Sequence, residues 1–246
     1  MHEKLNKLFS QLKIRKNQNI ILHSNIAGIL QFKKFNKDTA CSYLFNYIKK
    51  FTRKSVLLIP TYNYNFTKGI KFDLKKTPSQ VGLFSNYLLK RHYSKRTPNP
   101  IFSHLVFDPK LNFNKNISHN YAFGEKSIFN EISKKKFKII CFCCSTDRIT
   151  FLHHVETLMS VKYRFMKKFK GEIIDNKKRY KMIFNYFVAK KKVRHAIKEN
   201  KVNELIDGQS FIEKNFGRFK CYSLDADKLA LKLSKKIEKN NFYLIK

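Results

Sequence analysis

The feature that most constrains the fold is a series of short apolar runs separated by longer amphipathic segments. Residues 20–22, 56–59 and 139–144 carry only apolar side chains, and such runs are typical of strands buried on both faces of a sheet. Between them, residues 38–51 and 83–88 repeat apolar positions at three- and four-residue steps, as amphipathic helices do. The alternation predicts an α/β fold: a three-layer α/β/α sandwich around a central, mostly parallel or mixed sheet.

Further elements follow from local signals. Residues 4–13 have helical apolar spacing, Asp38 and Asp225 are placed to cap helices, and Thr77-Pro78-Ser79 opens another. The apolar residues 242–245 predict a closing strand. Because no linker or internal repeat divides the 246 residues, we expect a single domain over residues 1–246.

Composition limits the compartment and the chemistry. Five cysteines, three of them within residues 141–144, do not resemble a disulfide framework or a paired set of zinc ligands. We therefore expect reduced cysteines and no metal. No apolar run approaches the length of a membrane span, and the N-terminus has no uninterrupted signal-peptide core. These observations predict a cytoplasmic protein without a membrane span.

The charge is strongly positive, with 52 Lys+Arg against 17 Asp+Glu. Basic residues interleave with aromatics from about residue 165, which is also typical of nucleic-acid-binding grooves, so a non-enzymatic basic nucleic-acid-binding protein is the alternative of a different class. We favour solvated lysines spread along the chain, with Phe184, Tyr186 and Phe187 packing on the main sheet, and expect no nucleic-acid partner. In either case, the charge attracts anionic ligands and repels polycations.

Candidate site residues follow the predicted strands. Ligands of open α/β sheets bind at the carboxyl ends of strands. There the chain places the following polar residues: His23, Ser24, Thr61, Tyr62 and His153.

The segment after residue 144 carries the sharpest pattern. Thr150, His153 and Glu156 are spaced three apart, so on a helix they project from one side. A histidine beside a carboxylate can remove a proton near neutral pH. A structural histidine at a helix start would show the same spacing.

Ordered blocks of the sequence resemble the aminoglycoside 3-N-acetyltransferase family over roughly residues 5–170. The blocks are Ile21-Leu22-His23-Ser24-Asn25 through Gly28; Pro60-Thr61-Tyr62-Asn63; Phe72-Asp73 with Thr77-Pro78-Ser79; Arg96-Thr97-x-x-Pro100-x-x-Ser103; His119 with Phe123-Gly124; and Asp147-x-x-Thr150-x-x-His153-x-x-Glu156 with Tyr163-Arg164.

The resemblance implies an N-acetyltransferase that moves an acetyl group from acetyl-CoA to a primary amine. It implies that His153 is the general base, with Glu156 either orienting it or binding the acceptor amine, and that residues 165–246 are a more variable C-terminal extension of the domain. On the basis of this resemblance, we assign cofactor binding to His23, Ser24, Asn25, Arg96, Thr97 and Ser103. We assign substrate binding to Thr61, Tyr62, Asp73, Asn99 and Thr150.

Asn99 departs from the family pattern, in which His-Pro is common at Asn99-Pro100. Asparagine cannot act as a base, so we expect an altered acceptor specificity. Compensation by His104 or His119 is the alternative, but we interpret both as surface or packing residues. Because the chain is cationic, we prefer as acceptor an amino sugar, including one linked to a nucleotide, used in surface polysaccharide biosynthesis. Acetylation of an aminoglycoside antibiotic, conferring resistance, is the second hypothesis. The sequence does not predict the oligomeric state.

Overall fold

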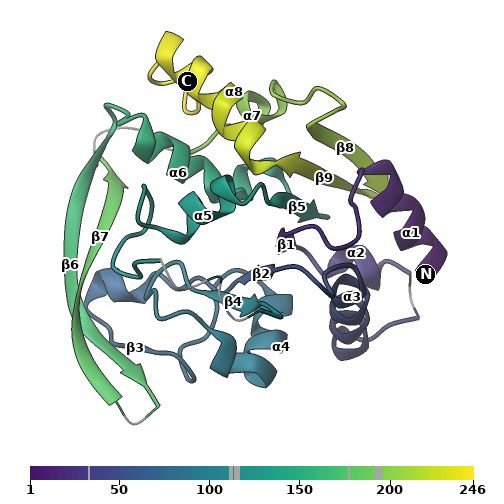
Figure 1. Cartoon of the computed structure of the whole chain (residues 1–246), viewed down its shortest axis with the longest axis horizontal. Helices are drawn as coiled ribbons and strands as arrows, with labels where there is room; N and C mark the ends of the chain where they lie inside the picture. Colours follow the sequence, from purple (N-terminus) through teal and green to yellow (C-terminus); the bar gives the residue numbers. More distant parts are fainter. Residues whose placement is uncertain (33, 111–112, 114–116, 177, 192–195) are drawn as a thin grey trace.

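A computed structural model describes residues 1–32, 34–110, 113, 117–176, 178–191 and 196–246. Its main sheet has six strands in the order β4-β2-β1-β5-β9-β8 (Figure 1). These strands span Ile20–Ser24 (β1), Leu57–Pro60 (β2), His104–Phe107 (β4), Lys138–Phe142 (β5), Phe211–Phe216 (β8) and Phe219–Asp225 (β9).

Three central strands of this sheet run parallel. β1 pairs with β2 on one side and with β5 on the other, both in parallel. β4, β9 and β8 are added in antiparallel fashion, so the sheet is mixed. The carboxyl ends of β1, β2 and β5 therefore meet at one edge, where ligands bind in sheets of this kind.

Helices cover both faces of the main sheet, as the sequence predicts. Along β1, Ile20 and Leu22 belong to one apolar cluster while Ile21 belongs to the other, because successive side chains of a strand point to opposite faces. The first cluster includes residues of α1 (His2–Gln11), α2 (Ala27–Leu30), α3 (Lys37–Phe51) and α4 (Leu83–His92). The second includes residues of α5 (Ile128–Lys134), α6 (Phe151–Leu158), α7 (Glu199–Asn203) and α8 (Ala226–Lys239).

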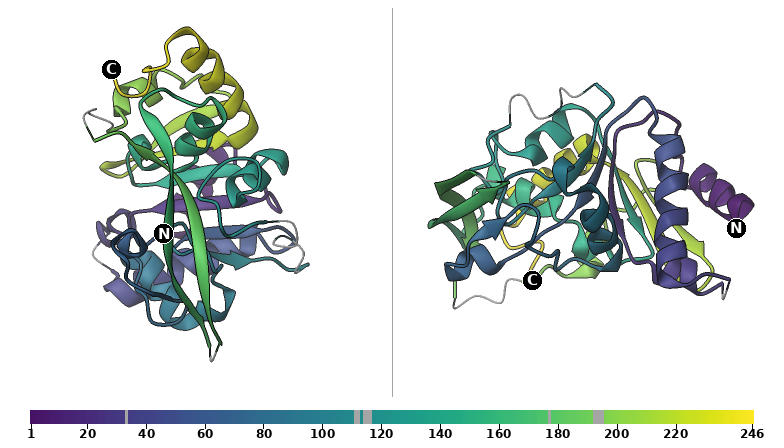
Figure 2. Two further views of the ribbon diagram at one scale, coloured as in Figure 1. Left: turned by 90° about the vertical axis from the view of Figure 1, so that its left-hand side faces the viewer. Right: turned by 90° about the horizontal axis from the view of Figure 1, so that it is seen from below.

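A second sheet of three strands stands beside this sandwich. Its order is β3-β6-β7, with β3 at Phe72–Asp73 and the long hairpin of β6 (Arg164–Asp175) and β7 (Lys178–Ala189). The hairpin crosses the side of the molecule that faces the viewer in the left panel of Figure 2. Phe184, Tyr186 and Phe187 belong to or pack against the apolar cluster that covers one face of the main sheet, as expected, although they lie on the second sheet. Within this cluster Phe184 packs beside Phe66 of the short helix Asn65–Lys68.

The C-terminal third also contributes to the main sheet. β9 pairs with β5 from Lys138↔Asp225 to Cys141↔Tyr222, and β8 continues from β9. That residues 165–246 extend the same single domain stays a prediction, and these pairings support it.

Three local predictions are wrong. Helix α3 is capped by Asn36, whose side chain accepts from Thr39 N–H, and not by Asp38. The helix expected to open at residues 77–79 begins at Leu83, because Gly82 has a φ of 117° that no helical residue adopts. Residues 242–245 form turns and no strand, because the N–H groups of Tyr243 and Ile245 donate to the carbonyls three residues earlier and not to a neighbouring strand.

Candidate active site

The polar residues that follow β1, β2 and β5 surround a cavity of about 430 Å³. Its wall combines strand ends, the loop after β5 and the start of α6. The lining residues are Leu22, His23, Ser24, Pro60, Tyr62, Tyr64, Gln80, Val81, Ser85, Phe102, Cys144, Asp147, Arg148, Thr150, His153 and Tyr186. Six residues singled out from the sequence are thus brought together: His23, Ser24, Tyr62, Asp147, Thr150 and His153.

His153 and Glu156 form the pair that their spacing predicts. Both lie on α6, which docks through the buried side chains of Leu152 and Val155. Nδ1 of His153 is 2.5 Å from Oε2 of Glu156. Nη2 of Arg164 also lies 3.0 Å from Nδ1, but the shorter contact is to a carboxylate, which only accepts. Nδ1 therefore donates its proton to Glu156, and Nε2 is left as the basic nitrogen of the ring.

Glu156 is held from three sides. The Tyr163 hydroxyl donates to its Oε1 at 2.5 Å, and Nε of Arg164 forms an ion pair with its Oε2 at 2.9 Å. The Glu156 side chain is fully buried, whereas a quarter of the His153 side chain remains exposed. The carboxylate is therefore beneath the histidine, where it can orient the ring but cannot reach a ligand in the cavity.

The electrostatics keep Glu156 ionised. Burial alone would raise the pKa of its carboxyl, but His153, Arg164 and Tyr163 together hold the pKa below its ordinary value. Tyr163 and Arg164 are residues to which sequence reasoning gave no role. Their place in the last resembling block, seven and eight residues after Glu156, was the only signal.

A second cavity of about 480 Å³ adjoins the first. It shares Asp147, His153 and Tyr186 with the first cavity and is otherwise lined by Arg164, Val188, Ala189, Ala196 and Ile197. His153 therefore lies where the two cavities meet, and a ligand in either one can reach its ring.

Two further histidines are buried near the first cavity. His104 Nε2 is 3.0 Å from the Tyr62 hydroxyl, which also hydrogen-bonds Thr150. Burial lowers the pKa of His104 to about 3 and that of His23 to about 4. Both are neutral at physiological pH. This agrees with the packing role expected of His104, while the assignment of His23 to cofactor binding stays a prediction. Of these three histidines, His153 is the one paired with a carboxylate.

Arg96, Thr61 and Ser103 lie in a buried network outside both cavities. The Arg96 guanidinium donates to the Ser103 hydroxyl and to the carbonyls of Thr61, Leu74 and Thr77. The Thr61 and Ser103 hydroxyls are 2.9 Å apart. This network ties β2 to the loops before β4 and after β3, which is a structural role. None of these three residues lines either cavity, and their assignment to ligand binding stays a prediction.

The remaining predicted residues also make local contacts. Asn25 accepts from Ala27 N–H, Asp73 from Lys75 N–H, and Thr97 Oγ1 from His104 N–H. Asn99 accepts from Phe102 N–H at 2.7 Å and donates to the Tyr121 carbonyl. None of the four lines either cavity. Asn99 shapes the loop that carries Phe102, which does line the first cavity.

Within the described ranges, no group of three or more His, Cys, Asp or Glu side chains could hold a metal ion. The five cysteines are free thiols. No helix in the described part of the chain is both long and apolar enough to cross a bilayer.

The mixed sheet, the strand-end cavities and the histidine–carboxylate pair are together typical of an α/β enzyme. Residues 51–238 match the aminoglycoside 3-N-acetyltransferase family, and the chain belongs to that family of N-acetyltransferases.

Solved structures of the same fold are similar over nearly the whole chain. The structure "AAC-IIIb binary with CoASH" is 15% identical, covers 97% of this chain and 96% of its own, and has a TM-score of 0.78. AAC-VIa bound to sisomicin, at room temperature, is 13% identical with 97% of both chains covered and a TM-score of 0.79. YokD from Bacillus subtilis is 13% identical, covers 98% of this chain and 94% of its own, and has a TM-score of 0.75. No curated protein matches the sequence significantly.

Proposed function

We propose that this chain transfers the acetyl group of acetyl-CoA to a primary amine of an aminoglycoside-type amino sugar, with His153 as general base. The observation that carries the proposal is the His153–Glu156 pair, 2.5 Å apart, at the junction of two cavities. Each cavity can hold one of the two substrates, so that the thioester and the amine meet beside His153.

The chemistry needs one proton-transfer group. The amine nitrogen attacks the thioester carbonyl as Nε2 of His153 removes its proton, which forms the new C–N bond and a tetrahedral intermediate. Collapse of the intermediate breaks the C–S bond, and the coenzyme A thiolate leaves and takes up a proton. After His153 has taken the proton it is an imidazolium, and Glu156 stabilises this charge through its hydrogen bond to Nδ1. In this proposal His153 is the catalytic residue and Glu156 is the positioning residue.

Two known relatives support the substrates. The name of the AAC-IIIb structure gives coenzyme A as its ligand, and that of the AAC-VIa structure gives the aminoglycoside sisomicin. Neither the family nor these structures point to polysaccharide biosynthesis. The aminoglycoside hypothesis is therefore the better supported of the two.

The charge of the site favours a second candidate, an amino sugar linked to a nucleoside diphosphate. Asp147 is the only carboxylate among the described residues that line the two cavities. It also accepts from the Ser145 hydroxyl and lies 3.5 Å from Nε of Arg148. A polycation gains little from one partly neutralised carboxylate, while phosphates are attracted by Arg148 and by the net charge of +35.

A coenzyme A release assay tests the proposal. The wild type and His153→Ala are compared with sisomicin, glucosamine and a nucleoside-diphosphate-linked glucosamine as acceptors. Turnover with sisomicin that His153→Ala abolishes would support the aminoglycoside hypothesis. Turnover confined to the nucleotide-linked sugar would replace it with the second candidate, and undiminished turnover of His153→Ala would exclude the proposed base.

A further inference from the structure

We propose that the outward face of the β6–β7 hairpin is a docking surface for an anionic lipid bilayer. The exposed side chains of this hairpin outer face are Met166, Lys168, Lys170, Arg179, Lys181 and Ile183. The strand register defines it: Lys168 pairs with Asn185 and Lys170 with Ile183, while the intervening pair Phe169↔Phe184 points the other way. Because Phe184 is fully buried against the body of the protein, the hairpin outer face points away from it.

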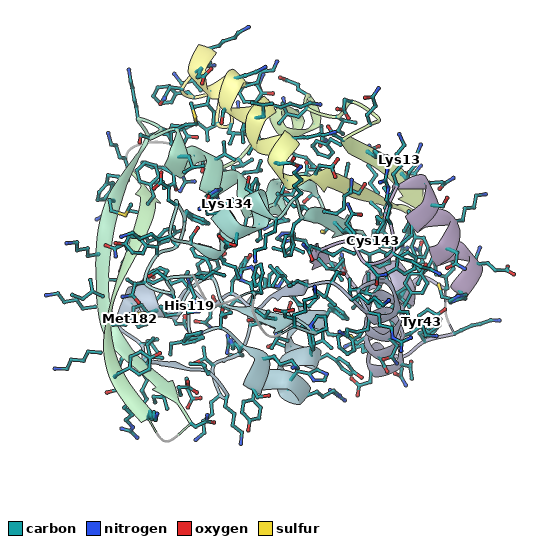
Figure 3. All side chains as sticks on the ribbon, viewed as in Figure 1. Lys13, Tyr43, His119, Lys134, Cys143 and Met182 are labelled. Carbon is teal, nitrogen blue, oxygen red and sulfur yellow. The ribbon has the colours of Figure 1, made fainter. Side chains whose placement is uncertain are left out.

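Charge is the first property of this face. Four exposed basic side chains lie on it by the strand register: Lys168, Lys170, Arg179 and Lys181. One carboxylate, Glu172, lies on the same face and pairs across the strands with Lys181. Nitrogen-tipped side chains project from the hairpin away from the rest of the molecule, on the left of Figure 3. The face is complementary to a surface dense in negative charge.

Exposed apolar side chains are the second property. Met166 and Ile183 are each 49% exposed among these lysines. Water is a poor solvent for side chains of this size, so a partner that covers them gains free energy beyond the ionic attraction.

A bilayer satisfies both properties. A second copy of the chain would bring like charges together. A single-stranded nucleic acid would neutralise the lysines, but its bases stack on aromatic faces and leave the aliphatic side chains of Met166 and Ile183 uncovered. Anionic headgroups can pair with the lysines, while the acyl boundary just beneath them accepts the apolar side chains.

The location has a consequence for access to the site. Tyr186, Val188 and Ala189, on or next to the inner side of β7, line the second cavity. A bilayer on the opposite side of the hairpin would therefore lie close to His153. Only this step rests on the proposed function. If that function holds, an amino sugar held at a membrane surface comes within reach of His153.

Vesicle co-sedimentation of the full chain at about 0.15 M salt, where the Debye length is roughly 8 Å, tests the surface. The vesicles are phosphatidylcholine alone or phosphatidylcholine with phosphatidylglycerol. Lys168→Glu/Lys170→Glu is compared with Lys228→Glu/Lys235→Glu, which makes the same charge change at exposed positions of α8. Met166→Ser/Ile183→Ser is compared with Leu231→Ser, since Leu231 is 60% exposed on α8. Thermal melting checks that each variant folds.

We expect the wild type to bind only the vesicles that contain phosphatidylglycerol. The hairpin charge variant should bind at least about 25-fold more weakly, since each basic residue at a bilayer contributes about 1 kcal/mol. The hairpin apolar variant should bind these vesicles about fivefold more weakly. Both α8 variants should bind them as tightly as the wild type does. Equal losses from hairpin and α8 charge variants would overturn the proposal, as would absence of vesicle binding. Tight binding of a single-stranded oligonucleotide, lost with Lys168→Glu/Lys170→Glu while vesicle binding is unchanged, would assign the face to nucleic acid instead.

Discussion

Nδ1 of His153 lies 2.5 Å from Oε2 of Glu156, and the same carboxylate is bound by Arg164 and Tyr163 beneath the cavity wall. This arrangement fixes the histidine ring and the nitrogen that carries its proton. We therefore expect both the activity and the stability of the protein to depend on this one buried carboxylate.

Replacing His153 by Ala should lower kcat about 10²- to 10⁴-fold, because the proton of the amine then has no acceptor. The KM for acetyl-CoA should change little. Steady-state kinetics with the best acceptor of the panel measures both values. His92→Ala, at a half-buried histidine outside both cavities, is the matched control and should retain full activity.

Glu156→Gln separates the orienting role of this residue from its structural role. We expect a roughly 10²- to 10⁴-fold lower kcat and about 3–5 kcal/mol less stability, since Arg164 is left buried without its counterion. Adding Arg164→Met removes that charge and should restore part of the stability, measured by urea unfolding, without restoring turnover. Recovery of turnover in the double variant would contradict the orienting role.

Arg96→Lys tests whether this residue supports the structure or binds the cofactor. A lysine cannot reproduce the fork that bonds Ser103, Thr61, Leu74 and Thr77. The variant should lose about 2–4 kcal/mol of unfolding free energy. The Kd for acetyl-CoA, measured by calorimetry at a temperature where the variant is folded, should stay within about twofold. A large rise in Kd at unchanged stability would instead favour the cofactor-binding assignment.

Gly28→Ala should destabilise the end of β5. A Cβ at Gly28 would lie 2.2 Å from Sγ of Cys143, and overpacking of this kind costs about 1–3 kcal/mol. Cys143 has a φ of 57°, which glycine adopts readily, so Cys143→Gly should relieve the clash. A double-mutant cycle of unfolding free energies measures the coupling. Purely additive effects would rule out the steric explanation.

Stability should fall in mild acid. Burial lowers the pKa of His104 to about 3 from an ordinary value of 6.5, so between these values only the unfolded chain is protonated there. The contribution of His104 is complete above pH 6.5 and is lost as the pH falls, by about 2 kcal/mol at pH 5. His104→Phe should reduce the difference between urea unfolding at pH 7 and pH 5 by about that amount. An unchanged difference would show that His104 is protonated in the folded protein.

The sequence by itself predicts the α/β/α sandwich and the His153–Glu156 pair, because both depend on the spacing of residues close together in the chain. The apolar runs at residues 20–22, 56–59 and 139–144 predict the buried strands β1, β2 and β5, although β5 already ends at Phe142. A three-residue step on α6 brings His153 next to Glu156 whatever the rest of the chain does. The ordered blocks supply the family, which the match over residues 51–238 shows.

Tertiary structure alone decides which residues reach the cavities. Arg96, Ser103 and Thr61 occur in resembling blocks, yet their polar groups bond one another and nearby carbonyls in the interior. Arg164 and Tyr163 lie at the start of a long hairpin and reach Glu156 only because β6 passes beside α6. A periodic pattern reports on neighbours a few residues apart. Whether a buried polar group faces a ligand or another loop depends on contacts between distant segments, and no spacing along the chain encodes those contacts directly.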